Sequence, residues 1–229
     1  MENQVQKLGV SSNKLSVLYN SLIIDRYRPD ANDQDFRKEL GVEENTLLVA
    51  NIGRLSPEKG QADFILAAKN VLETHQNTKF LLIGVGPEQE RLENLANDNG
   101  IRDAVIFTGY RNNMISIYNS LDLVVQSSHT EGMPNVVLEA SLMEVPVIAT
   151  KVGGTSEIIN DYESGVLIAA GSHEIIAKKI IEYLKYPDLY VKMAIQAKLR
   201  VQQYFNFQNR TKILMNIYEE ITQHNKDYC

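Results

Sequence analysis

Six short apolar runs constrain this 229-residue chain more than any other feature. They are rich in Val, Ile and Leu and nearly continuous, which is typical of strands that are covered on both faces. Segments with helical spacing of apolar residues separate them. This alternation predicts an α/β fold, a doubly wound parallel (Rossmann-like) sheet with helices on both faces. The predicted strands are 46–52, 79–83, 104–107, 121–125, 145–149 and 166–169.

The predicted helices between the strands have turn residues at their ends. They span 62–75, 88–99, 112–120, 134–143 and 156–161. After Gly171 the chain becomes helical, with further helices predicted over 172–185, 188–204 and 207–223. Apolar residues of the last segment predict a face that needs a partner, and hence self-association of the chain; they are Phe205, Phe207, Ile213, Leu214, Ile217 and Tyr218.

Composition excludes several classes of protein. Apolar residues make up 44% and charged residues 23% of the chain, as in an ordinary globular protein. The net charge of −6 disfavours a partner made of polymeric nucleic acid. The longest apolar runs have five residues, and the first residues lack the pattern of a signal peptide, so we expect neither a membrane span nor export. The single Cys229 suits the cytoplasm and excludes a zinc site of several cysteines.

In an open α/β sheet, ligands bind beyond the carboxyl ends of the strands. The loop 51–60 follows the first predicted strand and contains Gly53, Arg54 and Lys59. Two cations beside a helix start, with a glycine that permits close backbone approach, can clamp a pyrophosphate. A solvated Arg and Lys in a turn explains the same residues equally well, so the spacing leaves both interpretations open.

The loop 130–139 follows the fourth predicted strand. Pro134 suits the first turn of a helix, whose free N–H groups could face an anion. Glu131 precedes that helix, and Glu139 lies among apolar neighbours, where an unpaired carboxylate would be costly. This cost favours a binding role over a merely exposed position. The N–H groups in question belong to Gly132, Met133 and Asn135.

Three other features are weaker. Gly153 and Gly154 open a helix, as phosphate-binding glycines do, but so do many structural glycines. The segment 84–90 nearly matches a dinucleotide fingerprint but has Gln89 in place of the third glycine, which leaves a nicotinamide-dependent oxidoreductase as a poorly supported alternative. The pair Asp33 and Asp35 favours a helix start over a metal site.

Taken together, the motifs resemble the donor-binding half of the family 4 glycosyltransferases of GT-B fold. The resemblance rests on GRLSPEKG at 53–60, FTGY at 107–110, EGMPNVVLEA at 131–140, PVIAT at 146–150 and VGGTSEII at 152–159. It covers about residues 15–225. The two glutamates separated by seven residues, placed after the two cations, make it specific.

The resemblance implies roles for individual residues. Arg54 and Lys59 would hold the donor diphosphate and offset charge on the leaving nucleotide. Glu131 would contact the transferred sugar. These three residues would be the catalytic residues. Glu139 would take the ribose hydroxyls, and Tyr110 and Arg111 would lie near the base. Backbone groups would line the phosphates; they belong to Gly53, Gly132, Met133, Pro134, Asn135 and Val136.

The resemblance also implies a reaction and a setting. The donor substrate would be a UDP- or GDP-linked sugar, transferred with retention of configuration and without a metal or other cofactor. The acceptor would be a glycan or a lipid-linked molecule, in polysaccharide or glycoconjugate biosynthesis. The protein would lie in the cytoplasm, either free or peripherally attached to the inner face of the membrane. A non-catalytic nucleotide-sugar-binding or partner subunit is the alternative interpretation.

The resemblance divides the chain into three parts. Residues 1–20 would be the remnant of an N-terminal-domain helix and linker, 21–205 the nucleotide-sugar-binding domain, and 206–229 a C-terminal crossover helix. An acceptor-binding N-terminal domain would come from outside this chain or from a partner subunit. The sequence departs from the family pattern at Ser21, Ile23 and Glu144. Glu144 stands at a helix C′ position where the family has Gly. Because left-handed geometry at this position favours Gly, we expect Glu144 either to cost about 1 kcal/mol or to change the turn.

Overall fold

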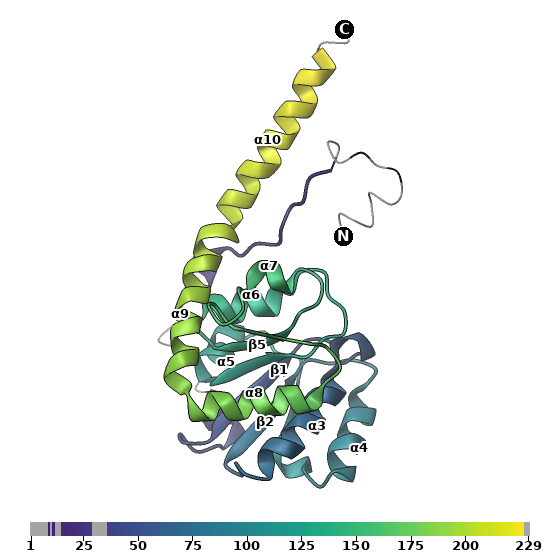
Figure 1. Cartoon of the computed structure of the whole chain (residues 1–229), viewed down its shortest axis with the longest axis vertical. Coiled ribbons are helices and arrows are strands. Elements are labelled where there is room, and N and C mark those ends of the chain that lie inside the picture. The colour runs from purple at the N-terminus through teal and green to yellow at the C-terminus, as the bar shows by residue number, and fades with distance from the viewer. Residues whose placement is uncertain (1–8, 10, 12–14, 29–35, 227–229) are drawn as a thin grey trace.

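Figure 1 shows the computed structural model, which describes residues 9, 11, 15–28 and 36–226 and, beyond 222, only the backbone. Six parallel strands form one sheet in the order β3-β2-β1-β4-β5-β6. The doubly wound sheet is therefore confirmed. The strands are β1 Leu47–Ile52, β2 Thr78–Ile83, β3 Val105–Gly109, β4 Leu123–Gln126, β5 Val147–Thr150 and β6 Val166–Ile168.

Helices cover both faces of the sheet (Figure 1). One face carries α3 (Gln61–Leu72), α4 (Gln89–Asp98) and α8 (His173–Lys185). The other carries α2 (Phe36–Leu40), α5 (Met114–Ser120), α6 (Asn135–Leu142) and α7 (Thr155–Ile158). Helix α9 (Pro187–Tyr204) begins on the first face and ends on the second. Short 3₁₀ turns are η2 (Ile24–Arg26), η3 (Pro57–Lys59) and η4 (Arg102–Ala104).

Alternate residues of each strand build two separate cores. Val49 of β1 packs with Phe64 of α3 and Phe80 of β2, whose rings meet edge to face at 5.6 Å. Leu48 and Ala50 face the opposite core. Because both faces are buried, the strands lack a polar side, and this is why they were predictable as continuous apolar runs. Every predicted strand boundary lies within two residues of the observed one.

The end of α6 adopts the conformation that normally requires glycine. The amide of Val145 donates to the Ala140 carbonyl at 2.9 Å, and that of Glu144 donates to the Ser141 carbonyl at 3.2 Å. This pair of bonds is a Schellman motif, with Glu144 at the left-handed C′ position and φ of 57°. Of the two expected outcomes, Glu144 thus keeps the left-handed turn and does not change it. The Glu144 carboxylate also pairs with Lys198 of α9.

We expect Glu144→Gly to raise the free energy of unfolding by about 0.5–1 kcal/mol, because a left-handed residue with a Cβ costs about 1–2 kcal/mol and the exposed ion pair returns little. Glu144→Ala is the control, since it removes the ion pair and keeps the strained backbone. Thermal unfolding should place Glu144→Gly above the wild type and Glu144→Ala at or below it. The reverse order would contradict this account of the turn.

The segments that enter and leave the domain pair with each other. The amide of Leu22 donates to the Phe205 carbonyl at 2.8 Å, and the amide of Phe207 donates to the Leu22 carbonyl at 2.9 Å. Phe205 is 3% exposed and packs edge to face on Tyr19. Its assignment to the free apolar face of the last helix is therefore wrong, because Phe205 belongs to the core.

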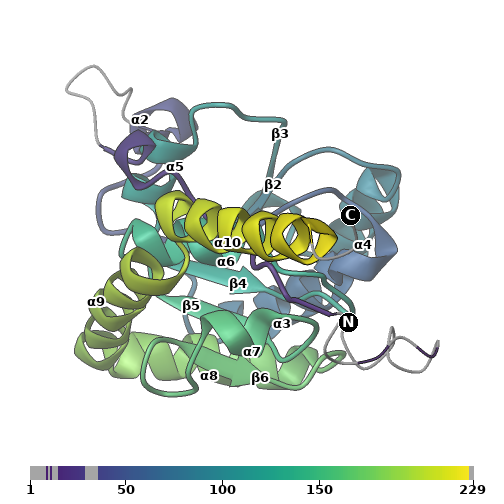
Figure 2. The ribbon, with the colours of Figure 1, turned by 90° about the horizontal axis from the view of Figure 1, so that it is seen from above.

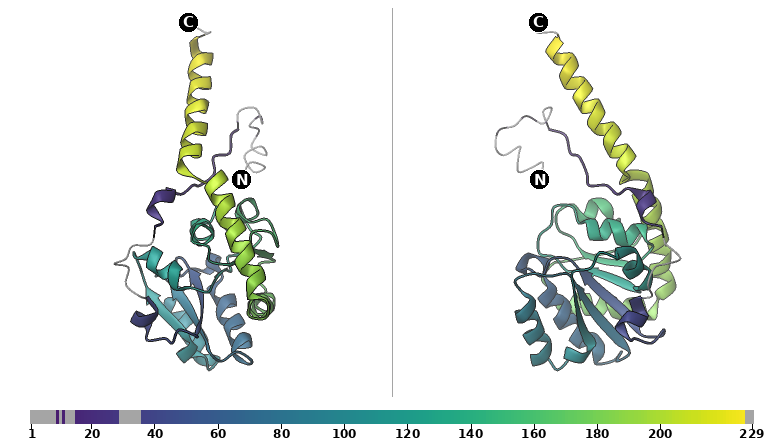
Figure 3. Two further views of the ribbon diagram at one scale, coloured as in Figure 1. Left: turned by 90° about the vertical axis from the view of Figure 1, so that its left-hand side faces the viewer. Right: turned by 180° about the vertical axis from the view of Figure 1, so that it is seen from behind.

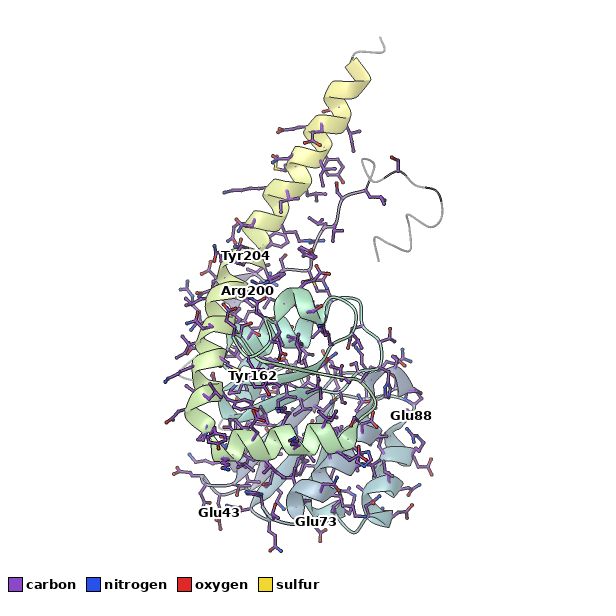
Figure 4. The ribbon with its side chains drawn as sticks, in the orientation of Figure 1. Glu43, Glu73, Glu88, Tyr162, Arg200 and Tyr204 are labelled. Carbon is purple, nitrogen blue, oxygen red and sulfur yellow. The ribbon has the colours of Figure 1, made fainter. Side chains whose placement is uncertain are left out.

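Helix α10 (Phe207–Lys226) points away from the sheet in both views of Figure 3, and in Figure 2, seen from above, it lies in front of α6 and β4. Phe207, Ile213 and Tyr218 are 43%, 50% and 60% exposed, so three of the six residues predicted for the apolar face are confirmed as uncovered, while Leu214 and Ile217 are partly covered. Self-association stays a prediction. At the end of α9, Arg200 lies over the Tyr204 ring at 5.4 Å, and both are labelled in Figure 4.

None of the described helices is both long and apolar enough to cross a membrane. The Asp33–Asp35 pair, Cys229 and most of residues 1–14 lie outside the described residues, while residues 15–20 form neither helix nor strand. The division of the chain at residues 20 and 205 stays a prediction.

Candidate active site

The sheet order places β1 between β2 and β4, so that chain connections diverge on either side of β1. Such a switch point is where open α/β sheets bind ligands. The loop after β1 carries Lys59, and the loop after β4 carries Glu131. Lys59 Nζ lies 2.7 Å from Glu131 Oε1, so the two loops meet through an ion pair across the switch point.

Backbone contacts hold the two loops together. The amide of His129 donates to the Glu58 carbonyl at 2.8 Å, and the Ser127 hydroxyl donates to the Gly60 carbonyl at 2.8 Å. The Gln61 side-chain amide donates to the Arg54 carbonyl at 2.9 Å. The loop that begins at Gly53 is thus fixed to the sheet, which disfavours its interpretation as a solvated turn.

Glu131 is strongly oriented, and only 9% of its side chain is exposed. Besides Lys59, Oε1 accepts hydrogen bonds from the Ser128 hydroxyl at 2.7 Å and the Gln126 amide at 3.3 Å. Gln126 is itself held by the Thr150 amide at 3.1 Å. Within the described part of the chain, Oε2 accepts no hydrogen bond, so this oxygen is available to a ligand.

Sequence reasoning missed Gln126 and Ser128, although a signal existed. Both are buried polar residues at the carboxyl end of an apolar strand, Gln126 as the last residue of β4 and Ser128 two residues later. Polar side chains in such a position are usually satisfied by a partner. Here that partner is Glu131, together with the Thr150 hydroxyl, which donates to the Ser128 carbonyl at 2.6 Å.

Arg54 is exposed and makes neither an ion pair nor a side-chain hydrogen bond with any residue that the structure describes. Gly53 differs from expectation. Its amide donates to the Ile83 carbonyl at 2.9 Å. This donor is therefore used within the protein and is not free for the phosphate contact that was predicted for it. A Cβ placed on Gly53 would have no neighbour within 4 Å, which leaves open space for a ligand beside its backbone.

A pocket of about 570 Å³ opens at the carboxyl ends of β1, β2 and β3. It gathers four of the predicted site residues, whereas Lys59, Glu131, Glu139 and the loop 132–136 lie outside its lining. Its walls are mostly apolar, and Tyr110 at its rim is 76% exposed. The lining residues are Ile52, Gly53, Arg54, Ile83, Gly84, Val85, Gly86, Tyr110, Arg111 and Met114.

Arg111 is engaged by the protein itself. Its guanidinium lies 2.6 Å from Glu39 Oε1 and 5.6 Å from the centre of the Phe36 ring, both on α2. This long-range pairing could not be predicted from the sequence. Arg111 therefore builds the pocket wall with its charge already compensated.

The start of α6 has free donors. Pro134 is the N-cap of α6 and not its first residue as predicted, because Asn135 is the first residue with helical backbone angles. No carbonyl of the described residues accepts a hydrogen bond from the amides of Gly132, Met133, Asn135 or Val136. These four amides are available to an anion, as predicted.

Asn20 is a further residue that sequence reasoning missed. Its side-chain amide donates to the Met133 carbonyl at 3.0 Å and to Asn135 Oδ1 at 3.1 Å. The segment that enters the domain thereby contacts the loop before α6. The sequence gives no hint of this contact, because the two partners are 113 and 115 residues away.

Glu139 lies half-buried on α6 and accepts a hydrogen bond at Oε2 from the Tyr118 hydroxyl of α5 at 2.9 Å. The Tyr27 hydroxyl also lies near this carboxyl. Burial raises the pKa of the Glu139 carboxyl, and the two hydroxyls oppose that rise. Burial also raises the pKa of Tyr118, and the neighbouring Glu139 adds to it.

Glu139 should make stability depend on pH. Its pKa is raised in the folded state above the ordinary value of 4.5, so its contribution to the free energy of unfolding is complete below pH 4.5 and is lost as the pH rises through the raised pKa. We expect urea unfolding to show wild type losing stability relative to Glu139→Gln over this window. The exposed Glu73→Gln (Figure 4) controls for net charge. A constant difference across the window would contradict this.

The paired glycines have a structural role. A Cβ on Gly153 would lie 2.0 Å from the Glu131 carbonyl oxygen, and φ at Gly153 is 54°. The amide of Gly154 donates to the Gly132 carbonyl at 2.6 Å. They let the loop after β5 contact the loop of Glu131, and this accounts for them without a phosphate.

The near-fingerprint at 84–90 is explained in the same way. Cβ atoms on Gly84 and Gly86 would lie 2.0 Å and 2.1 Å from the carbonyl oxygens of Gly53 and Leu55. These glycines are needed because the loops after β1 and β2 pack closely. The nicotinamide alternative therefore loses its main support.

Among solved structures, the chain is similar to Anabaena Alr3699/HepE in complex with UDP-glucose, with a TM-score of 0.86 and 26% identity over 97% of this chain and 61% of that one. It is also similar to the C-terminal domain of the glycosyl transferase group 1 protein LpcC from Francisella tularensis, with a TM-score of 0.72 and 29% identity. That match covers 81% of this chain and 99% of that domain. The fold is thus that of one half of a GT-B glycosyltransferase.

A curated relative is the uncharacterised glycosyltransferase MJ1607 of Methanocaldococcus jannaschii, 30% identical over 90% of this chain and 54% of the relative. Another is N-acetyl-alpha-D-glucosaminyl L-malate synthase of Bacillus anthracis, 27% identical over 98% of this chain and 58% of that protein. The chain spans little more than half the length of these relatives. The family model for glycosyl transferases group 1 matches residues 32–200, and the chain therefore belongs to this family.

Proposed function

We propose that this chain is the donor-binding half of a glycosyltransferase that transfers a sugar from a UDP-linked donor with retention of configuration. The observation that carries the proposal is the Lys59–Glu131 ion pair across the β1–β4 switch point. It sets a cation and an oriented carboxylate beside each other where a nucleotide sugar presents its diphosphate and its sugar. The Anabaena structure holds UDP-glucose, which supports uridine over guanosine as the nucleoside.

Arg54 and Lys59 would bind the diphosphate. The Lys59 ammonium carries three N–H donors, and Glu131 takes one, so the others can reach phosphate oxygens. Arg54 has no partner to give up among the residues that the structure describes. When the bond between the anomeric carbon and the diphosphate breaks, these cations and the free amides before α6 would stabilise the charge on UDP, as preorganised donors do.

Glu131 would orient the transferred sugar. Its Oε1 is saturated by Lys59, Ser128 and Gln126, while Oε2 can accept a sugar hydroxyl. Glu139 would accept the ribose hydroxyls, and the pocket beside Tyr110 and Arg111 would take the base. The acceptor oxygen replaces the diphosphate on the anomeric carbon, and its proton leaves with the nucleotide.

We place the acceptor, a glycan or a lipid-linked molecule of polysaccharide or glycoconjugate biosynthesis, on a part outside this chain. The relatives' greater length supports such a part, either as an N-terminal domain or as a partner subunit. Because the acceptor would bind outside this chain, we expect no transfer by this chain alone. No metal is needed in this scheme, because the two cations and the helix amides carry the charge.

A thermal-shift panel tests the proposal, with UDP, GDP, ADP, UDP-glucose and NAD each at millimolar concentration. A ligand at about 100 times its dissociation constant stabilises by about 2.7 kcal/mol, which raises the melting temperature by several degrees in a chain of this size. We expect a shift with UDP and UDP-glucose and none with NAD. No shift with any nucleoside diphosphate would contradict the proposal.

The alternative, a non-catalytic subunit that binds the same donor, predicts the same shifts. Transfer separates the two. The chain combined with an acceptor-binding half should transfer glucose from UDP-glucose, and the Glu131→Gln variant should bind UDP but transfer far less. Binding without transfer in that combination would favour the non-catalytic alternative.

A further inference from the structure

Two tyrosine hydroxyls lie beside the carboxylate of Glu139, and they come from elements far apart in the chain. Tyr118 lies on α5, is 1% exposed and donates to Oε2 at 2.9 Å. Tyr27 follows η2, in the segment that enters the domain, and its hydroxyl lies close enough to the Glu139 carboxyl to lower the pKa of that group. The surroundings are the apolar core between the sheet and helices α5, α6 and α9.

Burying these hydroxyls and the Glu139 carboxylate together lowers the free energy of unfolding, a cost that is expected only where the arrangement is needed for another purpose. Burying a hydroxyl or a carboxylate in an apolar core costs free energy, and pairing recovers only part of it. A phenylalanine at either tyrosine and an apolar residue at 139 would fill the same space. The hydrogen bonds do something that packing alone does not, because they fix the direction in which the Glu139 carboxylate points.

The number of lone-pair positions that stay free on the Glu139 carboxylate matches the two hydroxyls of a diol. An ionised carboxylate has about four lone-pair positions. The Tyr118 hydroxyl takes one of them, and the Tyr27 hydroxyl, once turned toward the carboxylate, would take a second, which leaves two. A ribose presents two neighbouring hydroxyls, so the remaining positions suffice for both.

We infer that Tyr118 and Tyr27 are positioning residues that hold the Glu139 carboxylate in the orientation that accepts the two ribose hydroxyls of the nucleotide. This inference rests on the proposed function. It goes beyond that function in assigning a role to two residues that lie outside the loops of the donor-binding motif.

Calorimetric titration tests the inference with two probes, UDP and 2′,3′-dideoxy-UDP, against the wild-type chain, Tyr118→Phe and Tyr27→Phe. The dideoxy probe lacks both hydroxyls and therefore cannot sense the orientation of Glu139. We expect each variant to bind UDP about three- to tenfold more weakly, the range of one net hydrogen bond, and to bind the dideoxy probe as the wild type does.

Tyr190→Phe is the matched control. Tyr190 is also 1% exposed and also donates one hydrogen bond, to the Lys179 carbonyl at 3.3 Å, but it lies in the opposite core. Its variant should leave the ratio of the two affinities unchanged. Tyr27→Phe, at a half-buried position, keeps the test informative if Tyr118→Phe fails to fold.

The outcomes separate the inference from the function on which it rests. If Glu139→Gln weakens UDP binding while both tyrosine variants bind UDP like the wild type, the positioning role is wrong and the proposed function stands. If a tyrosine variant weakens both probes equally, its role is only structural, which also overturns the inference. A wild-type chain that binds no UDP overturns the proposed function and the inference with it.

Discussion

Lys59→Met is expected to weaken UDP binding by about 10- to 100-fold. A charge-assisted hydrogen bond is worth about 1.5–3 kcal/mol, and each 1.4 kcal/mol changes a dissociation constant tenfold. The substitution keeps the unbranched apolar stem and removes only the ammonium group that faces Glu131. Calorimetric titration of folded protein with UDP measures the effect.

The control for Lys59→Met is Lys69→Met, which removes the same charge from an exposed position on α3. It should change the dissociation constant by less than about twofold, because an exposed charge away from the site is screened by salt. Equal effects of the two substitutions would show that net charge drives the binding. In that case the role of Lys59 would be lost.

Gly153→Ala is expected to lower the free energy of unfolding by about 2–4 kcal/mol and to weaken UDP binding. The new Cβ would meet the Glu131 carbonyl oxygen at 2.0 Å, so the loop of Glu131 must move. Overpacking of this kind costs about 1–3 kcal/mol, and the left-handed backbone adds about 1 kcal/mol. Urea unfolding and UDP titration measure the two effects.

Gly171→Ala separates the clash from the backbone strain. Gly171 also has a positive φ, of 77°, but its Cβ would have no neighbour within 4 Å. This variant should lose only about 1 kcal/mol and should bind UDP like the wild type. If both alanine variants were equally stable, the contact between Gly153 and the Glu131 loop would have no energetic weight.

The fold was predictable because its pattern is local. Buried parallel strands are continuous apolar runs, and each helix between them repeats its apolar residues at helical spacing, so six strands could be placed before their order was known. The unusual turn at Glu144 was predictable for the same reason, since it depends on the last turn of one helix. Phe205 was misassigned because its partners, Tyr19 and Leu22, approach it from the other end of the chain.

The site was predictable only in part. The residues that carry charge stand out in short motifs, and the parallel sheet brings the loops of Lys59 and Glu131 to one edge. What holds those residues is set by tertiary packing. Tyr118 lies within an apolar helix, and Arg111 is compensated by Glu39 from a helix 72 residues earlier (111 − 39). Such pairings leave no periodic trace in the sequence.

The occupied amide of Gly53 shows a second limit of predicting a site from the sequence. A glycine in a loop after a strand suggests a phosphate contact, but the same glycine also continues the pairing with β2 through Ile83. Sequence spacing cannot distinguish these two uses. The amides of Gly132, Met133, Asn135 and Val136 have no carbonyl partner among the described residues and stay the predicted phosphate contacts.

A crystal structure of this chain with UDP tests the central claim most directly. We expect the diphosphate to lie within hydrogen-bond distance of Lys59 Nζ and the Arg54 guanidinium. The ribose hydroxyls should contact Glu139, and the base should lie in the pocket beside Tyr110. A diphosphate bound elsewhere, with the Lys59–Glu131 pair and Glu139 left without contact to the nucleotide, would contradict that claim.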